Sequence, residues 1–194
     1  MVIRAVIFDL DGTLVETNVD FALVRDHLGI PQGVGILEHI AALPERDRVQ
    51  AQAEVRRQEL AGAHAAVSMP GAASLLAGLD AADVPYAVVT RNTREAALLS
   101  LEALGVQGVR LLAREDCTPK PDPKGPLLLA TEWGTAPSEI LFVGDFIWDL
   151  LTAEAAGMPS CLFAPPFQPR PELEARADHV VRELGEVLSL LNLT

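Results

Sequence analysis

Five short runs along the chain are nearly continuous in apolar residues and do not alternate with polar ones. Runs of this kind predict strands that are buried on both faces, as in a parallel sheet. They occupy residues 3–8, 86–90, 109–112, 140–143 and 160–163. A sixth apolar segment, residues 178–181, is followed by a helical pattern over 183–191, which predicts an edge strand and a final helix.

Amphipathic segments with helical spacing separate most of these runs, at residues 72–82, 94–104, 126–133 and 147–156. Asn92 followed by Glu95 is typical of a capping box, and Gly105 and Gly157 are suited to helix ends. A repeated succession of strand, helix and strand is typical of an α/β fold with a doubly wound parallel sheet. We expect the strand order 3-2-1-4-5, which places the first and fourth strands side by side.

The first two predicted strands are separated by far more chain than a crossover helix needs. Here the pattern predicts three helices, at residues 21–28, 34–43 and 45–67, with Asp20 as the cap of the first. On the third helix, we expect a stripe at helical spacing to be buried: Val49, Ala53, Leu60 and Val67. We interpret residues 16–69 as a helical cap domain over the C-terminal edge of the sheet, and residues 1–15 and 70–194 as the core domain.

Composition and charge narrow the function classes. Of 194 residues, 49% are hydrophobic, which favours a globular fold, and the net charge of −12 disfavours nucleic acid and anionic membranes as partners. No apolar stretch is long enough to span a bilayer, and Arg4 and Asp9 interrupt the N-terminal run, so we expect neither a membrane anchor nor a signal peptide. Cys117 and Cys161 are too isolated for a disulfide framework or a zinc site, and we expect a cytoplasmic protein.

Two carboxylates, Asp9 and Asp11, directly follow the first predicted strand. Acidic groups this close repel each other unless a cation or a shared proton compensates. A purely structural alternative is a hairpin turn at Asp11-Gly12, with residues 13–16 as the returning strand. In the functional interpretation, Asp9 is a nucleophile that attacks phosphorus, and Asp11 protonates the leaving oxygen and later deprotonates water.

The complementary groups come from three later segments, which a doubly wound sheet brings to the same rim. Thr90 and Arg91 follow the second strand and could bind phosphate oxygens, although an isolated threonine here more often bonds the local backbone. Lys120 lies between Pro119 and Pro121, which stiffen the loop around it, although a single lysine in such a turn is by default a surface residue.

Asp145 and Asp149 follow the fourth strand and lie four residues apart at the start of a helix. Both could simply favour the helix N-terminus, but a hard cation with oxygen ligands explains better why two acids follow a buried strand. We expect Asp145 to bind the ion directly, and Asp149 through water or an outer contact.

In this order, the motifs resemble those of the haloacid dehalogenase-like hydrolase superfamily, over essentially the whole chain: Asp9-x-Asp11-Gly12-Thr13, Thr90, Lys120-Pro121 and Gly144-Asp145-x-x-x-Asp149. The resemblance implies a Rossmann-like core, a helical cap and Mg²⁺. It assigns Asp9 as nucleophile, Asp11 as acid and base, and the metal to the Asp9 carboxylate, the Asp11 carbonyl and Asp145. Asp-Gly-Thr-Leu-Val-Glu-Thr and Lys-Pro-Asp-Pro look most like the phosphoglycolate phosphatase-like subgroup.

This resemblance implies a Mg²⁺-dependent phosphatase that acts on a small phosphorylated metabolite such as phosphoglycolate or a sugar phosphate. We expect a monomer or a homodimer. One alternative is a phosphosugar mutase of the same superfamily. Another is a non-catalytic binding module, which the intact set of motif residues disfavours. Phe146 departs from the small polar residue that many relatives carry after the metal-binding aspartate, and the cap is short for the subgroup.

Overall fold

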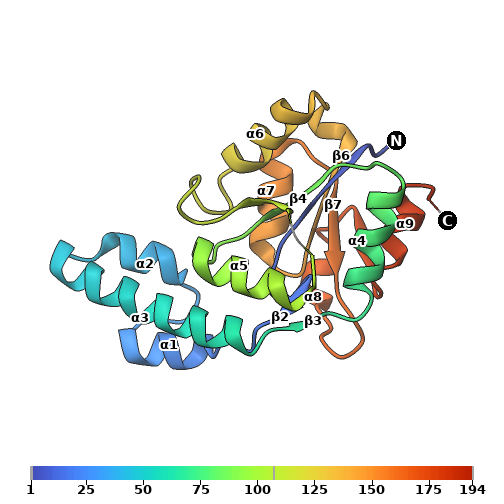
Figure 1. Cartoon of the computed structure of the whole chain (residues 1–194). Helices are drawn as coiled ribbons and strands as arrows, with labels where there is room; N and C mark the ends of the chain where they lie inside the picture. Colours follow the sequence, from blue (N-terminus) through green and yellow to red (C-terminus); the bar gives the residue numbers. More distant parts are fainter. Residues whose placement is uncertain (1, 107, 194) are drawn as a thin grey trace.

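A six-stranded parallel sheet forms the centre of the computed structural model, which describes residues 2–106 and 108–193 (Figure 1). In spatial order its strands are β5 (Arg110–Leu112), β4 (Tyr86–Val89), β1 (Ala5–Phe8), β6 (Ile140–Gly144), β7 (Ser160–Phe163) and β8 (His179–Val181). The predicted doubly wound order is confirmed, and the C-terminal segment supplies the edge strand β8. Strand β1 pairs with both β4 and β6, so their C-terminal ends meet at the middle of one rim.

Helices cover both faces of this sheet because alternate residues of each strand point to opposite sides. On β1, Val6 and Phe8 pack into a cluster with α4 (Ala72–Ala81), α5 (Arg94–Ala103) and α9 (Glu186–Leu190). Ala5 and Ile7 face the other way, toward α6 (Lys124–Trp133) and α7 (Ile147–Ala156). A short 3₁₀ helix, Pro137–Glu139, precedes β6, and α8 (Pro171–Glu174) lies between β7 and β8. Double burial explains why the strands read as continuous apolar runs.

Three helices, α1 (Phe21–Leu28), α2 (Ile36–Ala42) and α3 (Glu45–His64), extend to one side of the sheet and form what we call the helical insert (Figure 1). A short antiparallel ribbon of β2 (Val15–Glu16) and β3 (Val67–Ser68) joins it to the sheet. The hairpin alternative is therefore wrong in its pairing, because β2 pairs with β3 and not with β1. The third helix also ends before Val67, which lies in β3. As predicted, Asp20 caps α1 by accepting from the Leu23 N–H at 2.8 Å.

The predicted buried stripe on α3 is wrong. Val49 and Val67 are 61% and 56% exposed, Ala53 is also exposed, and Leu60 is only half-buried. The buried positions of α3 are instead Ala51, Val55, Glu59, Gly62 and Ala63. This face packs on α1, α2 and α5, and Val24 and Ile40 share its apolar cluster. The error arose because the true stripe includes a charged residue, which hydrophobic periodicity alone rejects.

That residue, Glu59, ties the helical insert to the sheet. Its carboxylate is 4% exposed and accepts hydrogen bonds from Nη1 and Nη2 of Arg114, at 2.9 and 3.0 Å. It also accepts the Thr93 backbone N–H at 3.1 Å. The predicted capping box at Asn92 is wrong, because Thr93 is the N-cap of α5 and Glu59 satisfies its N–H from another helix. Charged, bidentate hydrogen bonds of this kind are among the stronger ones in proteins.

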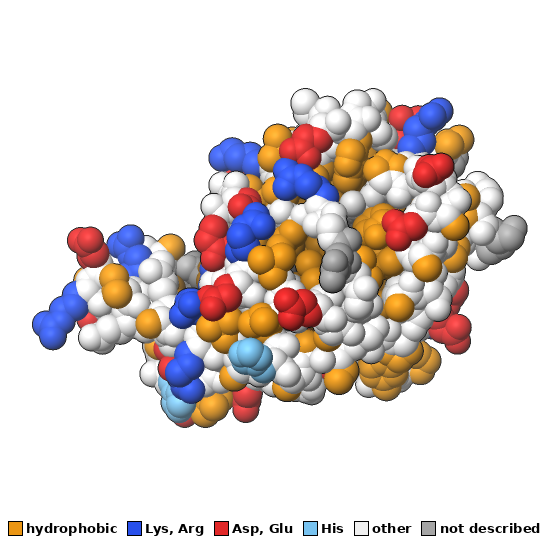
Figure 2. All heavy atoms as spheres, viewed as in Figure 1, with side chains coloured by type: hydrophobic (Ala, Val, Ile, Leu, Met, Phe, Trp, Pro, Cys, Tyr) orange, Lys and Arg blue, Asp and Glu red, His pale blue; other side chains and the backbone are white. Residues whose placement is uncertain are grey.

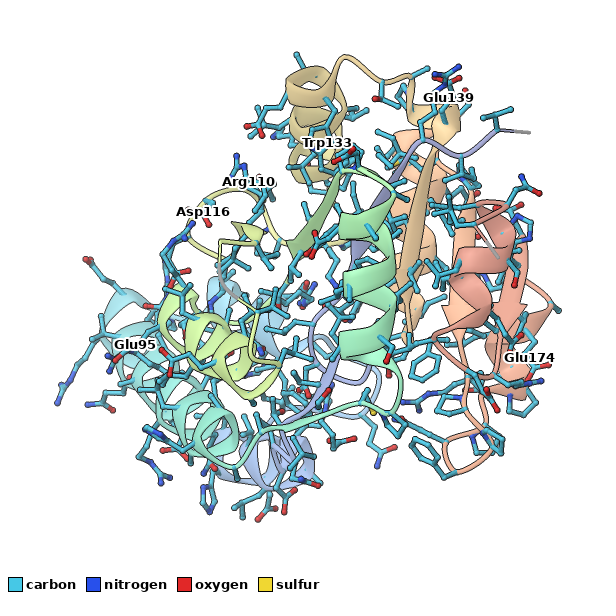
Figure 3. All side chains as sticks on the ribbon, turned by 45° about the vertical axis from the view of Figure 1, so that its right-hand side comes forward. Glu95, Arg110, Asp116, Trp133, Glu139 and Glu174 are labelled. Carbon is cyan, nitrogen blue, oxygen red and sulfur yellow. The ribbon has the colours of Figure 1, made fainter. Side chains whose placement is uncertain are left out.

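Charged side chains of both signs lie interspersed with apolar ones on the face seen in Figure 2. Several form exposed ion pairs, among them Arg56 with Glu95, which lies on α5 beside α3 (Figure 3). Exposed pairs contribute roughly 0–1 kcal/mol each, so they add little to stability. In the part of the chain that the structure describes, no helix combines the length and the apolar character needed to cross a bilayer.

Candidate active site

A cavity of about 850 Å³ lies between the C-terminal rim of the sheet and the helical insert. The chain brings all of the sequence-predicted site residues to its wall: Asp9, Asp11, Thr90, Arg91, Lys120, Asp145 and Asp149. They arrive from the ends of β1, β4 and β6 and from the loop that follows β5. The insert supplies the opposite wall, including Arg25, Gln58 and Glu59.

Asp9 is fixed at the tip of β1. Its backbone N–H continues the ladder to the Val143 carbonyl at 2.9 Å, which sets the direction of the side chain. One carboxylate oxygen, Oδ1, accepts the Leu10 N–H at 2.7 Å and lies 2.7 Å from Lys120 Nζ. Because Oδ1 is held twice, the carboxylate has a defined orientation in the cavity wall.

Lys120 lies buried between two carboxylates. Its Nζ lies 2.6 Å from Asp149 Oδ1 and 2.7 Å from Asp9 Oδ1, and the residue is 3% exposed. Burial alone would lower the pKa of Lys120, but the charges of Asp149 and Asp9 outweigh it and raise the pKa, so the ammonium stays charged. Lys124, the next lysine along the chain, has a 73% exposed side chain instead, and among the described residues it pairs with Asp122 at 3.6 Å.

Asp9, Asp145 and Asp149 offer carboxylate oxygens that all lie within 4.8 Å of one another. Burial, together with repulsion from Asp149 and Asp9, raises the pKa of Asp145 to about 8, and the nearby charge of Arg170 opposes this rise only in part. Such a cluster is unfavourable when fully ionised and fits a divalent cation with oxygen ligands. Gly12, at φ +82°, lets the Asp145 carboxylate lie directly against the backbone, because a Cβ at this position would lie 2.6 Å from Asp145 Oδ2. The donor set and this close backbone approach therefore suit a Mg²⁺-type ion.

Asp149 has a different environment. It lies in the first turn of α7, where Oδ2 accepts the Phe146 N–H at 3.0 Å while Oδ1 bonds Lys120. With both oxygens already accepting hydrogen bonds, its carboxylate serves first to orient Lys120 and to stabilise the helix N-terminus. Both aspartates of this segment belong to the cluster, but they differ in position and contacts: Asp145 precedes α7, whereas Asp149 lies on α7 and also bonds Lys120.

Asp11 lies two residues beyond Asp9, but it is not one of the three clustered carboxylates. Its Oδ1 accepts the Thr17 N–H at 3.1 Å. Burial raises the pKa of Asp11 to about 6, and the hydrogen bond from the Thr17 backbone N–H only partly opposes this. A carboxyl group with such a pKa can carry a proton near neutral pH, which suits an acid catalyst.

Thr90 and Arg91 follow β4. Thr90 Oγ1 accepts the Asn92 N–H at 3.1 Å, which is the local backbone contact that the sequence allowed, and its hydroxyl proton is still available for donation. Arg91 Nη2 donates to both carboxylate oxygens of Glu38 on α2, at 2.8 and 2.9 Å, and Nη1 donates to the Lys120 carbonyl. Its guanidinium lies 5.1 Å from the Trp148 ring centroid. Arg91 is therefore engaged with the insert as well as facing the cavity.

Arg170 is a site residue that the sequence interpretation missed. It lines the cavity, and its Nη2 lies 3.1 Å from Asp145 Oδ2. The sequence contained a clue to Arg170. Pro169-Arg170-Pro171 places a cation between two prolines, which is the same pattern that marked Lys120 as a candidate. Arg114 and Glu59 were missed too, because nothing local marks an ion pair between residues 55 positions apart.

Comparison with known proteins identifies the family. The family model for haloacid dehalogenase-like hydrolases matches residues 3–157. The chain belongs to this family. A phosphoglycolate phosphatase from Thiobacillus denitrificans is 33% identical, over 95% of this chain and 93% of that protein. A validoxylamine A 7'-phosphate phosphatase from Streptomyces hygroscopicus is 28% identical, over 95% of both.

A solved hydrolase from Pseudomonas syringae has the same fold, with a TM-score of 0.83, 25% identity and coverage of 97% of this chain and 98% of that one. The family and its phosphatase relatives confirm the predicted resemblance, including the phosphoglycolate phosphatase-like subgroup, and the enzyme class of phosphoric monoester hydrolases. The two curated relatives carry different substrate names, so family membership leaves the substrate open.

Proposed function

We propose that the protein is a Mg²⁺-dependent phosphatase that hydrolyses a small phosphorylated metabolite, such as phosphoglycolate or a sugar phosphate, through an aspartyl-phosphate on Asp9. The observation that carries this proposal is the buried arrangement of Lys120 against Asp9, beside the three-carboxylate cluster. A relative named a phosphoglycolate phosphatase supports the substrate class. Residues 16–69 would act as a cap that excludes bulk water from the cavity.

The proposed roles follow from these contacts. Asp9 attacks phosphorus through the oxygen that Lys120 does not hold, and Asp11 protonates the leaving oxygen and then deprotonates the attacking water. Lys120 and the Thr90 hydroxyl neutralise and orient the phosphate, with Arg91 as a further contact if it leaves Glu38. The Asp9 and Asp145 carboxylates and the Asp11 carbonyl would hold the ion, with Asp149 as an outer contact. When bound, Mg²⁺ would supply positive charge to the phosphate and the carboxylate cluster.

Metal dependence is tested by phosphate release. Initial rates over a panel of phosphorylated metabolites should show hydrolysis with Mg²⁺, loss of activity with excess EDTA, and recovery when Mg²⁺ is added back. An Asp145→Asn variant should need far more Mg²⁺ for half-maximal rate, because one ligand of the hard cation loses its charge. Wild-type activity that EDTA leaves unaffected would contradict the metal role.

The raised pKa of Asp11 gives a pH prediction. Its protonated form is needed to protonate an alkyl leaving group, so kcat/KM for an alkyl phosphate should fall as the pH rises through about 6. Hydrolysis of p-nitrophenyl phosphate needs no such proton and should fall less. The ratio of the two rates cancels effects that both substrates share. A ratio that is independent of pH, or unchanged in Asp11→Asn, would remove the acid role from Asp11.

The mutase alternative uses the same residues and differs in where the phosphoryl group goes. A mutase would return it to a sugar and release little inorganic phosphate, so measuring both products over the panel separates the two activities. A non-catalytic binding module would release no phosphate from any ester. The buried Lys120 and the fixed Asp9 favour catalysis, because orienting charges in this way is costly unless the site uses them.

A further inference from the structure

Arg170 occupies a position beside the carboxylate cluster that none of the proposed catalytic roles uses. Its Nη2 lies 3.1 Å from Asp145 Oδ2, and its guanidinium lies 6.0 Å from the Phe146 ring centroid. The side chain is about one-quarter exposed and lines the same cavity as Asp9. Its Nε is buried and has no hydrogen-bond partner in residues 2–106 and 108–193. The guanidinium therefore has donor capacity that its contact with Asp145 leaves unused.

The loop that carries Arg170 is built to hold it there. Prolines flank the arginine at 169 and 171, and the second is the first residue of α8, where its fixed φ suits a helix start. The backbone N–H of Leu173, which is buried, donates to the Arg170 carbonyl at 2.9 Å. A pre-ordered loop lowers the entropy lost when the side chain is fixed against Asp145.

The charges around the three-carboxylate cluster explain why a cation lies beside Asp145. Lys120 already pairs with Asp9 and Asp149. Asp145 is 6% exposed, and Arg170 is the cation that the structure pairs with it. A divalent ion held by Asp9 and Asp145 would need the same carboxylate that Arg170 contacts. Two cations on one buried carboxylate repel each other, so the guanidinium and the ion compete.

We propose that the Arg170 guanidinium neutralises the Asp145 carboxylate in the metal-free enzyme, and that it leaves this carboxylate when a divalent ion binds there. This inference rests on the metal site of the proposed function. Arg170 then sets how tightly the ion binds, and the released guanidinium remains at the cavity wall with its donors free. The proline-rich loop acquires a role in the ion affinity of the site.

The test is Mg²⁺ binding to EDTA-treated protein, measured by calorimetry with no substrate present. Arg170→Gln should bind Mg²⁺ at least about tenfold more tightly than wild type, because the competing charge is gone. Arg170→Lys should stay closer to wild type. The matched control is Arg176→Gln, which removes the same charge from an exposed position in the following segment and should change the affinity little. The metal-free Arg170→Gln protein should also melt at a lower temperature, and added Mg²⁺ should narrow the difference.

Equal or weaker Mg²⁺ binding in Arg170→Gln than in Arg176→Gln would overturn the proposal. If Arg170→Gln does not fold, Arg170→Lys decides, since a tenfold change in its affinity in either direction contradicts a pure charge role. If the proposed metal site itself is wrong, a different result is expected. Wild type and Asp145→Asn would then bind Mg²⁺ equally, whatever residue stands at position 170.

Discussion

Asp9→Asn should lower kcat by a factor on the order of 10⁴ or more, the scale of loss seen when an enzyme loses its nucleophile. The amide still accepts the Leu10 N–H, and Lys120 keeps its contact with Asp149, so the fold should survive. The measurement is phosphate release from p-nitrophenyl phosphate with Mg²⁺. Rapid quenching of wild type should also yield a peptide containing Asp9 that carries one phosphoryl group, and the variant should yield none.

A control for the Asp9 prediction is Asp83→Asn, which removes one negative charge from the loop between α4 and β4, at a residue that does not line the cavity. Asp83 is exposed and has φ +51°, a backbone conformation that asparagine tolerates well. This variant should keep wild-type activity. If Asp9→Asn retained activity within about tenfold of wild type, no covalent role for this carboxylate would survive.

Lys120→Met should produce the largest loss of stability among the site variants. Removing the ammonium leaves Asp9 and Asp149 facing each other with no cation between them, and breaking a buried pair in this way costs about 3–5 kcal/mol. The deficit should shrink as the pH falls, because protonation of either carboxylate removes the repulsion. Urea denaturation of the metal-free protein measures it. Activity should fall steeply as well, since the phosphate loses its buried cation.

Lys124→Met is the matched control for Lys120, four residues along the chain. Its side chain is exposed, so its free energy of unfolding should change by no more than about 0.5 kcal/mol. A double variant, Lys120→Met with Asp149→Asn, should recover part of the lost stability because one of the two facing charges is gone. Equal urea midpoints for the Lys120 and Lys124 variants would show that the pairing of Lys120 with Asp9 and Asp149 does not stabilise the fold.

The residues with a local signature were found from the sequence. The strands read as apolar runs because both faces of the sheet are covered, and the turn at Asp9–Asp11 follows such a run directly. The strand order of the doubly wound sheet then determines which strand ends are neighbours, since β1 pairs with both β4 and β6. These local and topological rules were enough to bring Asp9, Lys120 and Asp145 to one cavity.

The three-dimensional structure alone decided which charges pair across long separations. Glu59 is buried on α3 because Arg114 meets it from 55 residues away, and Arg170 reaches Asp145 from a loop 25 residues later. Asp149 turned out to hold Lys120 with one oxygen and the start of α7 with the other. A hydrophobic pattern records only whether a position favours burial. The energy of burying a charge depends on a partner that distant parts of the chain supply, and no local window of sequence contains it.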